Sequence, residues 1–464
     1  MRLRFKRGDI PGLRVTVMGL GLNGGGLESA RFFARSGAQV TVTDLRGEGV
    51  LAPSIKELEG LPVRYVLGGH ESGDFRNADI VIKNPAVRPD SPYLAQARRI
   101  ETDMSVFLSL CPGPVLAVTG SKGKSSTSSA LHFGLQALYP GACLGGNITR
   151  SPLSFLDGLR PEDPVVLELS SWQLGDIKGK GLLKPKVAII TNILPDHMDR
   201  YGGMEPYVAD KKVIYENQDP CCHTLYLYGD PWGEPFARET PGTPLAFSRT
   251  PLPPEVPGAW LENGEGFARL ENHRGLRILP RELRLAGSHQ KINLLAAGLA
   301  LRLFGLDAGL IQERLGRFPG IEHRLELCGE KAGVRFYNDS TATIPEALCA
   351  AVQSFPGLPL SLIAGGTDKE LDFGVFAGAA GIPKSIYLLE GSATPKLQNL
   401  LRGLNIAYNG PYSSLEKALA DAAEAAPPGG VVVFSPGCTS YGMFLNEFDR
   451  GHRFKEMVAK ITGT

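Results

Sequence analysis

Apolar runs of about five residues, separated by polar and glycine-rich segments, recur along the whole chain. Near the N-terminus they predict a strand over 14–18, a helix over about 27–36 and a second strand over 39–43. A turn with several glycines joins the first strand to the helix. This order is typical of the first βαβ unit of a Rossmann-like domain.

The middle of the chain continues the alternation. Apolar runs predict strands over 115–119, 164–169 and 185–191, and helical periodicity predicts a helix over 291–303. Residues 230–285 are rich in Pro, Gly and Glu, and they predict a peripheral hairpin region without recognisable chemistry.

The last third of the chain predicts strands over 334–338, 360–364 and 430–434, each followed by polar residues. Because parallel strands deliver their carboxyl ends to one edge of a sheet, this pattern predicts a doubly wound sheet with a ligand cleft along that edge. The pair Pro319 and Gly320 marks the expected boundary before this section.

A chain of 464 residues is long enough for about three domains. We therefore predict an α/β protein with an N-terminal Rossmann-like domain (1–103), a central P-loop mononucleotide-binding α/β domain (104–319) and a C-terminal Rossmann-like domain with a doubly wound sheet (320–464).

The segment after the strand at 115–119 carries the clearest chemistry. Gly120 and Gly123 permit a tight turn whose N–H groups converge on a phosphate, and the following helix adds the positive end of its dipole. Lys124 is placed for the β and γ phosphates, and the Ser125 hydroxyl for Mg²⁺. The loop is two residues shorter than the common Walker A pattern. An ordinary strand-to-helix turn is the alternative, but the coincidence of these residue types favours a nucleoside triphosphate site.

Two further strands supply candidate metal ligands. Glu168 stands near the end of one strand and His197 shortly after the next, so both are expected at the edge that carries the phosphate loop. A carboxylate and an imidazole there suit Mg²⁺ beside ATP. The alternatives are a solvated strand end for Glu168 and helix caps for Asp196 or Asp199.

Lys211 shares a predicted helical face with Tyr207 and with Ile214 or Tyr215. Such a lysine either extends its amine to water or has special chemistry, and the residues alone favour extension to water. Cys438 has no base fixed beside it by the sequence, so we interpret it as a buried structural cysteine.

The 49 Lys and Arg residues nearly balance the 48 Asp and Glu residues, which argues against nucleic acid and acidic membrane surfaces as partners. The chain has no apolar run of the roughly 18 residues that a membrane-spanning helix needs, and no apolar stretch typical of a signal peptide follows the basic N-terminus. The seven cysteines are irregularly spaced, which favours a reduced, cytoplasmic protein.

A set of motifs in a fixed order resembles the Mur ligase family. The similarity runs from about residue 14 to residue 454 and is strongest to the branch that adds D-glutamate, the MurD type. The motifs lie at 120–126, 168–173, 196–200, 287–290 with Asn293, 322–324, 338–340 and 435–440.

The resemblance implies an ATP-dependent amide-bond ligase of peptidoglycan precursor synthesis. Such an enzyme adds D-glutamate to UDP-N-acetylmuramoyl-L-alanine through an acyl phosphate and uses two Mg²⁺ ions. It also implies a cytoplasmic protein, and we expect a monomer. Lys211 falls where family members carry a carbamylated lysine, which reverses the interpretation given above: a carbamate turns the cation into a carboxylate-like Mg²⁺ ligand.

The resemblance also assigns residues to each ligand. The predicted catalytic residues are Lys124, His197 and Lys211. The predicted ATP site is Gly120, Ser121, Lys122, Gly123, Lys124, Ser125, Ser126, Gln290, Asn293, Arg324 and Asp339. The predicted UDP-substrate site is Gly21, Leu22, Asn23, Asp44, Arg46, Asn84 and Asn147. The predicted amino-acid site is Thr343, Lys369 and Ser440, and the predicted metal ligands are Ser125, Glu168, His197 and Lys211.

Two departures from the family pattern leave the amino acid open. Thr341 stands where most members of this branch carry lysine, and the order at 446–448 shifts the aromatic residue expected near glutamate. L-glutamate or another acidic amino acid is therefore an alternative. A folylpolyglutamate-synthase-like ligase would leave the domain with Asp44 unexplained, an NAD-dependent dehydrogenase would explain only the first section, and a non-catalytic nucleotide-binding regulator would leave the metal ligands idle.

Overall fold

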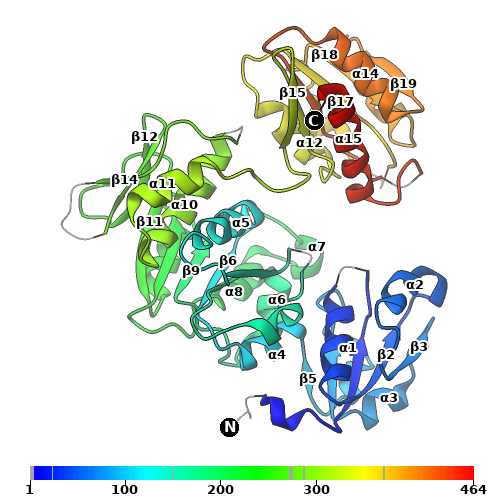
Figure 1. Ribbon diagram of the computed structural model, residues 1–464, viewed down its shortest axis with the longest axis vertical. Helices are drawn as coiled ribbons and strands as arrows, with labels where there is room; N and C mark the ends of the chain where they lie inside the picture. Colours follow the sequence, from blue (N-terminus) through cyan, green and yellow to red (C-terminus); the bar gives the residue numbers. More distant parts are fainter. Residues whose placement is uncertain are drawn as a thin grey trace. The chain divides into compact units, whose positions relative to one another are not determined.

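The computed structural model of the protein describes residues 5–22, 24–148, 150–270, 275–285, 288–368, 371–440 and 442–463. The chain forms two compact units, unit 1 (1–281 with 292–315) and unit 2 (282–291 with 316–464). Unit 1 contains two sheets and unit 2 contains one (Figure 1). No helix among the described residues is both long and apolar enough to span a bilayer.

The first sheet of unit 1 is parallel, with the strand order β3-β2-β1-β4-β5. This is the order of a Rossmann fold, so the predicted fold of this region is confirmed. The strands are β1 (Arg14–Met18), β2 (Gln39–Asp44), β3 (Val63–Leu67), β4 (Ile80–Lys83) and β5 (Ile100–Glu101), and the helices are α1 (Gly25–Arg35), α2 (Glu48–Lys56) and α3 (Ser72–Asn77).

The second sheet of unit 1 has nine strands in the order β14-β13-β12-β11-β10-β9-β6-β8-β7. Its inner strands are nearly continuous apolar runs because both faces of the sheet are covered. They are β6 (Val115–Thr119), β7 (Cys143–Gly146), β8 (Val165–Glu168), β9 (Val187–Ile190), β10 (His223–Leu227), β11 (Thr243–Ser248), β12 (Gly258–Glu262), β13 (Glu265–Arg269) and β14 (Leu276–Leu279).

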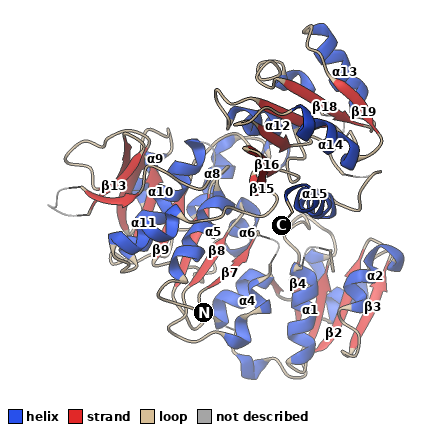
Figure 2. Cartoon of the chain, turned by 45° about the horizontal axis from the view of Figure 1, so that its top comes forward, coloured by secondary structure: helices blue, strands red, loops and turns tan. Residues whose placement is uncertain are grey.

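Helices flank these strands in Figure 2. They are α4 (Asp103–Leu110), α5 (Lys124–Leu135), α6 (Ser171–Ile177), α7 (Met198–Tyr201), α8 (Met204–Lys212), α9 (Gly233–Glu239), α10 (Ser288–Leu303) and α11 (Ala308–Gly316).

The region 230–285 corrects one prediction. It does contain an antiparallel hairpin, β12 with β13, followed by β14. However, β11 pairs in parallel with both β10 and β12, so the region continues the central sheet instead of standing apart from it.

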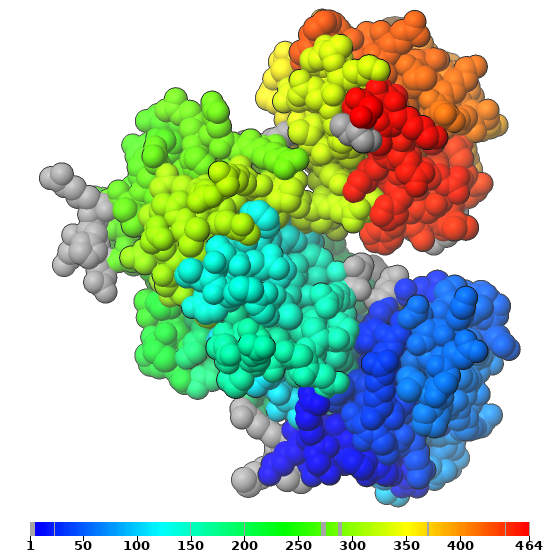
Figure 3. All heavy atoms as spheres, viewed as in Figure 1, coloured from blue at the N-terminus to red at the C-terminus, as the bar shows by residue number. Residues whose placement is uncertain are grey.

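The sheet of unit 2 has the order β15-β16-β20-β17-β18-β19, and only its edge strand β15 is antiparallel. Side chains close the spaces that the ribbon leaves between its helices and strands (Figure 3). The strands are β15 (Glu326–Lys331), β16 (Val334–Asn338), β17 (Leu360–Ala364), β18 (Ser385–Leu389), β19 (Asn409–Tyr412) and β20 (Val431–Phe434), and the helices are α12 (Pro345–Gln353), α13 (Thr394–Gly403), α14 (Leu415–Ala425) and α15 (Glu447–Thr462).

A buried ion pair joins the two sheets of unit 1. Lys83 Nζ at the end of β4 lies 2.8 Å from Asp176 Oδ2 on α6, and the side chains are 5% and 10% exposed. Burial raises the pKa of Asp176, and the neighbouring Lys83 opposes that rise. Both charged groups are thus removed from water, and each is stabilised by the opposite charge of the other.

Candidate functional site

The phosphate loop predicted between β6 and α5 has the backbone that its glycines permit. Gly120 has φ +139° and Gly123 has φ +85°. A Cβ at Gly120 would lie 1.9 Å from Thr191 Oγ1, and one at Gly123 would lie 2.4 Å from Asn293 Oδ1. Both positions therefore require glycine for space as well as for conformation. Helix α5 begins immediately after this turn, at Lys124.

The segment after β9 holds this loop from one side. Thr191 Oγ1 donates a hydrogen bond to the Lys122 carbonyl oxygen (2.6 Å), and Asn192 Nδ2 donates to the same oxygen (3.0 Å). The Lys122 N–H donates in return to Asn192 Oδ1 (3.0 Å). No sequence motif singled out Thr191 and Asn192, although their place at a strand end was a signal.

Ser121 is occupied within the loop itself. Its N–H donates to the Asn192 carbonyl oxygen (2.8 Å), its hydroxyl donates to the Leu194 carbonyl oxygen (2.9 Å), and it shares a hydrogen bond with the Tyr207 hydroxyl (3.0 Å). Of the hydroxyls predicted to contact ATP or metal, those of Ser125 and Ser126 lie half-buried on the first turn of α5. These two hydroxyls are therefore better placed than that of Ser121 for a ligand.

Two lysines converge on one carbonyl of the loop. Lys124 Nζ donates to the Gly120 carbonyl oxygen (2.9 Å) and to that of Ser121 (3.0 Å). Lys211 Nζ also donates to the Gly120 oxygen (2.9 Å), and its side chain comes from α8. The loop thus gathers two lysine side chains where the terminal phosphates of a nucleotide are expected.

Lys211 is only 1% exposed, so the interpretation that it extends its amine to water is wrong. Burial, followed by repulsion from Lys124, lowers the pKa of Lys211 from 10.5 to about 7. Near neutral pH a large fraction of this amine is therefore uncharged and carries a free lone pair.

Strand β6, which precedes the loop, lies between β8, which ends in Glu168, and β9, which precedes His197. Glu168 is 1% exposed; its Oε2 accepts from Ser128 Oγ (3.4 Å) and its Oε1 from Asn147 Nδ2 (3.1 Å). His197 is 45% exposed, and its ring centroid lies 4.9 Å from that of Trp172.

The donor set at this edge fits a divalent cation. Within the described part of the chain, no lysine or arginine pairs with the buried Glu168 carboxylate. A buried carboxylate without a counter-charge is costly, and Mg²⁺ favours oxygen ligands. Asn147, predicted for the UDP substrate, lies beside this carboxylate.

The predicted UDP-substrate residues of the first sheet gather around Asp44. Its Oδ2 accepts from the Gly21 N–H (3.2 Å) and from Arg46 Nη2 (3.0 Å), and Asn84 Nδ2 donates to the Gly19 carbonyl oxygen (3.4 Å). Burial would raise the pKa of Asp44, but the hydrogen bonds from Arg46 and Gly21 lower it. Leu22 is exposed nearby in sequence, and Asn23 lies outside the described residues.

In unit 2, Asp339 follows β16 and is buried. Its Oδ2 accepts from Ser435 Oγ (2.7 Å) and its Oδ1 from the Leu325 N–H (3.1 Å). Burial raises the pKa of Asp339 to about 7. Arg324 is exposed, and its charge partly opposes the rise in the pKa of Asp339. Two of the residues predicted for the nucleotide therefore lie near each other in unit 2.

A pocket of about 440 Å³ lies at the carboxyl ends of β17, β18 and β20. Ser440, predicted for the amino acid, lines it and is 4% exposed. Thr343 is half-buried in the segment after β16, and Lys369 lies outside the described residues. Other lining residues are Gly366, Thr367, Gly391, Ser392 and Arg450.

Two predicted ATP residues lie on α10. Asn293 packs against Gly123 of the loop, since a Cβ at that glycine would lie 2.4 Å from Asn293 Oδ1. Gln290 lies one turn earlier on the same face of the helix, and its buried Oε1 has no hydrogen-bond partner among the described residues. Cys438 is completely buried, as predicted, and burial raises its thiol pKa to about 12.

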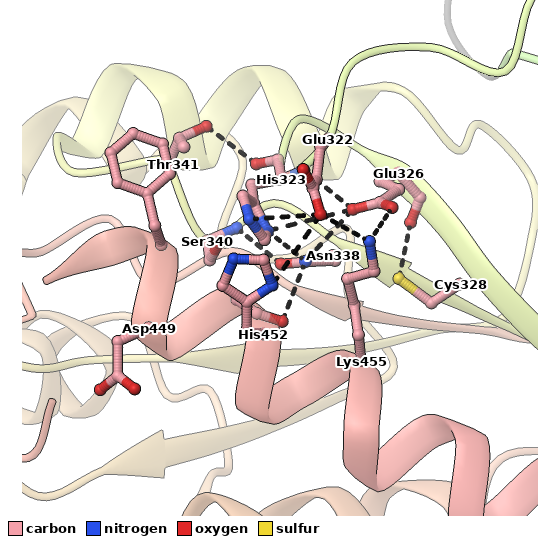
Figure 4. A network of polar contacts seen from close by, with 12 residues as sticks. Glu322, His323, Glu326, Cys328, Asn338, Ser340, Thr341, Asp449, His452 and Lys455 are labelled. Carbon is pink, nitrogen blue, oxygen red and sulfur yellow. Dashed lines mark hydrogen bonds and ion pairs between the residues drawn. The ribbon is translucent and has the colours of Figure 1, made fainter. Parts of the chain in front are cut away.

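A second polar cluster in unit 2 brings together Glu322, His323 and His452, whose ligand atoms lie within 4.8 Å of one another (Figure 4). Asn338 decides its chemistry. Asn338 Oδ1 accepts from the Ser340 N–H (3.1 Å), so Nδ2 is the atom that donates to His323 Nδ1 (2.9 Å). The neutral His323 ring therefore carries its proton on Nε2, the nitrogen 3.8 Å from Glu322 Oε1.

That protonated nitrogen has no lone pair for a metal ion. Lys455 Nζ also lies 2.8 Å from Glu322 Oε1 and 2.7 Å from Glu326 Oε1, and so supplies the positive charge that these carboxylates need. The cluster is accordingly an ion-pair network that fastens α15 to the segment 322–326.

Family models match two parts of the chain: the Mur ligase MurD-like N-terminal domain over residues 13–105 and the Mur ligase middle domain over residues 118–301. A UDP-N-acetylmuramoylalanine–D-glutamate ligase of Roseiflexus sp. (strain RS-1) is 43% identical, covering 98% of this chain and 100% of the relative. An enzyme of the same name from Treponema pallidum (strain Nichols) is 41% identical, and the match covers 98% of this chain and 99% of the relative.

Solved structures share the fold. UDP-N-acetylmuramate-alanine ligase MurC from Thermotoga maritima superposes with a TM-score of 0.62 at 20% identity, covering 97% of this chain and 100% of that one. MurF ligase from Thermotoga maritima, solved in complex with ADP, has a TM-score of 0.56 at 18% identity, covering 99% and 97%. With its full-length relatives and the matches over its first two sheets, this chain belongs to the Mur ligase family.

Proposed function

We propose that the protein uses ATP to join D-glutamate to UDP-N-acetylmuramoyl-L-alanine, and so makes a precursor of peptidoglycan. The observation that supports this proposal is the edge of the nine-stranded sheet, where the phosphate loop with Lys124 follows β6, between the strand that ends in Glu168 and the strand that precedes His197. The names of relatives that match nearly the whole chain support the choice of substrates.

The reaction needs two anions to meet. The alanyl carboxylate attacks the γ-phosphorus of ATP; a carboxylate oxygen–phosphorus bond forms and the bond to ADP breaks. Lys124 is the cation of the loop that would offset the charge on the phosphates. Ser125, Glu168, His197 and a modified Lys211 would hold Mg²⁺, which would supply further charge neutralisation, and we propose two such ions.

The second step forms the amide. The amine of glutamate attacks the activated carbonyl carbon, the carbon–nitrogen bond forms, inorganic phosphate leaves, and the nitrogen loses a proton. The pocket lined by Ser440 lies at the sheet edge of unit 2 expected to receive glutamate, together with Thr343 and Lys369. The Rossmann-like sheet would hold the UDP moiety at Gly21, Asp44 and Arg46.

Lys211 has the chemistry that carbamylation requires. An uncharged amine can attack CO₂; a nitrogen–carbon bond forms and a proton is released, which leaves a carbamate anion. A buried lysine whose pKa lies at about 7 supplies that uncharged amine near neutral pH. We propose that the carbamate of Lys211 is a metal ligand of the active enzyme.

We also propose that the enzyme acts as a monomer in the cytoplasm. The seven free thiols support a reducing environment. The apparent mass in size-exclusion chromatography, compared with 49.8 kDa for one chain, tests the oligomeric state.

The deciding experiment measures phosphate release from ATP and Mg²⁺ with UDP-N-acetylmuramoyl-L-alanine and D-glutamate, L-glutamate or no amino acid, and weighs the product. Release that needs D-glutamate, with one glutamyl residue added, is the expected result. Lys124→Met should abolish it, whereas Lys184→Met, a change in an exposed ion pair with Asp219, should not. Phosphate release with L-glutamate and not with D-glutamate would show that the enzyme uses the L-enantiomer. Turnover with a folate substrate would indicate a folylpolyglutamate-synthase-like ligase.

A further inference from the structure

Arg450 is a buried arginine without an acidic partner. It lies in the first half of α15 and is 1% exposed. Among the described residues, no carboxylate forms an ion pair with it. A guanidinium is one of the groups least often buried, so its position calls for a role other than charge pairing.

Its hydrogen bonds join two loops. Arg450 Nη2 donates to the Ser340 carbonyl oxygen (2.6 Å), and both Nη1 and Nη2 donate to the Cys438 carbonyl oxygen (3.1 Å each). Ser340 belongs to the loop after β16 and Cys438 to the loop after β20. Because β16 and β20 are neighbouring parallel strands, the two loops leave the sheet at the same edge.

These loops carry the residues predicted to meet two different ligands. Asp339, next to Ser340, is predicted for the nucleotide, and Ser440, two residues after Cys438, is predicted for the amino acid. Arg450 itself lines the same pocket as Ser440. One guanidinium therefore fixes the separation between the two predicted subsites.

The residue after Arg450 lets the helix come close enough. A Cβ at Gly451 would lie 2.2 Å from His323 Nδ1 and 2.3 Å from Ser340 Oγ. The Gly451 carbonyl oxygen accepts from Asn338 Nδ2 (3.3 Å), so the helix backbone also contacts the end of β16. The long Arg450 side chain thus reaches both loops, and the absence of a side chain at Gly451 lets helix α15 pack closely against His323 and Ser340.

The contact is kept although it leaves polar atoms unsatisfied. In the described part of the chain, the buried Arg450 Nε and Ser340 Oγ have no hydrogen-bond partner. Buried polar atoms without partners are uncommon and reduce stability, and they occur where a site requires a particular arrangement. This pattern is expected of a residue whose role is to hold the loops of a site in position.

We propose that Arg450 is a positioning residue of the ligase: it holds the loop after β16 and the loop after β20 in one relative placement, so that nucleotide and incoming amino acid are presented together. The inference rests on the function proposed above. It predicts a defect in use of the amino acid, because the guanidinium holds the backbone of the loop that carries Ser440.

The test compares KM values, which do not depend on the fraction of folded enzyme. In Arg450→Gln, the KM for D-glutamate should rise about tenfold or more, since hydrogen bonds from a charged donor are lost. The KM for the UDP-sugar should change by less than about twofold, because that ligand is assigned to the first sheet of unit 1. Arg450→Lys keeps a cation and should restore part of the loss.

Arg453→Gln is the matched control, since it removes an exposed arginine three residues further along α15 that pairs with Asp449 (3.1 Å). It should leave the KM values for D-glutamate and for the UDP-sugar unchanged. If Arg450→Gln does not fold, Arg450→Lys carries the test, with a smaller rise in the KM for D-glutamate expected. An unchanged KM for D-glutamate in the folded Arg450 variants, or an equal rise for all substrates, would overturn the proposal. Absence of turnover in the unaltered protein would instead contradict the ligase function.

Discussion

The Lys211 amine lies 2.9 Å from the Gly120 carbonyl oxygen and is almost completely shielded from water. Its pKa is 10.5 in the ordinary case and about 7 in the folded protein. Between these values the unfolded chain binds a proton that the folded chain does not, so stability rises with pH in this window. Below about pH 7 the Lys211 amine is protonated in the folded protein too, and the destabilisation caused by the buried ammonium has reached its full size.

Lys211→Met should therefore raise the melting temperature, most of all below pH 7, in buffer free of CO₂. The gain should be worth about 2–5 kcal/mol there and should shrink as the pH approaches 10.5. Calorimetry at several pH values measures it. Lys212→Met, the adjacent lysine in a partly exposed pair with Glu239, should show little change; the same gain at pH 6 and pH 9 for Lys211→Met would contradict the assigned pKa.

Carbamylation of the same residue has its own pH dependence. Because only the uncharged amine reacts with CO₂, the carbamate should increase as the pH rises through about 7. With ¹³C-bicarbonate, NMR should show one protected carbamate signal that Lys211→Met removes and Lys212→Met retains. A signal that persists in Lys211→Met would place the adduct elsewhere.

The thiols of Cys438 and Cys221 should react very differently. Cys221 is exposed, whereas Cys438 is buried with a thiol pKa raised to about 12, so it contains almost no thiolate. Maleimide should modify Cys221 in the native protein and leave Cys438 intact, as peptide mass mapping will show. Cys438→Ala should cost about 1–2 kcal/mol of stability and keep turnover. Loss of turnover in a stably folded variant would instead indicate that this thiol is a nucleophile.

At the scale of elements, the phosphate loop joins a strand, a turn and the start of a helix. Gly123→Ala places a methyl group 2.4 Å from Asn293 Oδ1 in addition to straining a left-handed residue. It should weaken ATP binding at least about tenfold, as measured by calorimetric titration, because Asn293 must move. Gly179→Ala has similar strain (φ +66°) but open space around it. It should lose about 1–2 kcal/mol of stability and bind ATP normally; equal ATP affinity in both variants would count against the predicted site.

The elements themselves show what sequence patterns can and cannot predict. The bounds of β1, β16 and β17 coincide with the predicted apolar runs, because a polar residue, a glycine or a proline marks each end. Helix α10 begins at Ser288, three residues before the predicted start at 291. Its first turn is polar and so carries no apolar periodicity.

The site shows the same division. Spacing and residue type pointed to Gly120, Lys124 and Glu168, which the structure places on one sheet edge. They did not reveal that Asn147 would donate to Glu168, or that Arg450 would bridge two loops. Those contacts join residues distant in sequence, and they depend on tertiary packing that no local pattern encodes.

At the scale of the whole molecule, the two sheets of unit 1 are tied by Lys83 and Asp176. Lys83→Met would leave a carboxylate in a site that is 10% exposed, so unit 1 should lose about 3–5 kcal/mol of stability. The loss should lessen at low pH, where Asp176 takes up a proton. Differential scanning calorimetry measures both effects. Lys184→Met breaks only an exposed pair and should cost at most about 1 kcal/mol; a similar loss in both variants would argue against a buried tie.

The course of the chain between the two units also limits how they can move. The chain passes from one unit to the other at 281/282, at 291/292 and at 315/316, and the second passage lies inside α10. A helix is stiff over a few turns, so this passage cannot behave as a loose tether. The connection between the two units therefore includes residues of a helix, which is stiffer than an extended chain of the same length.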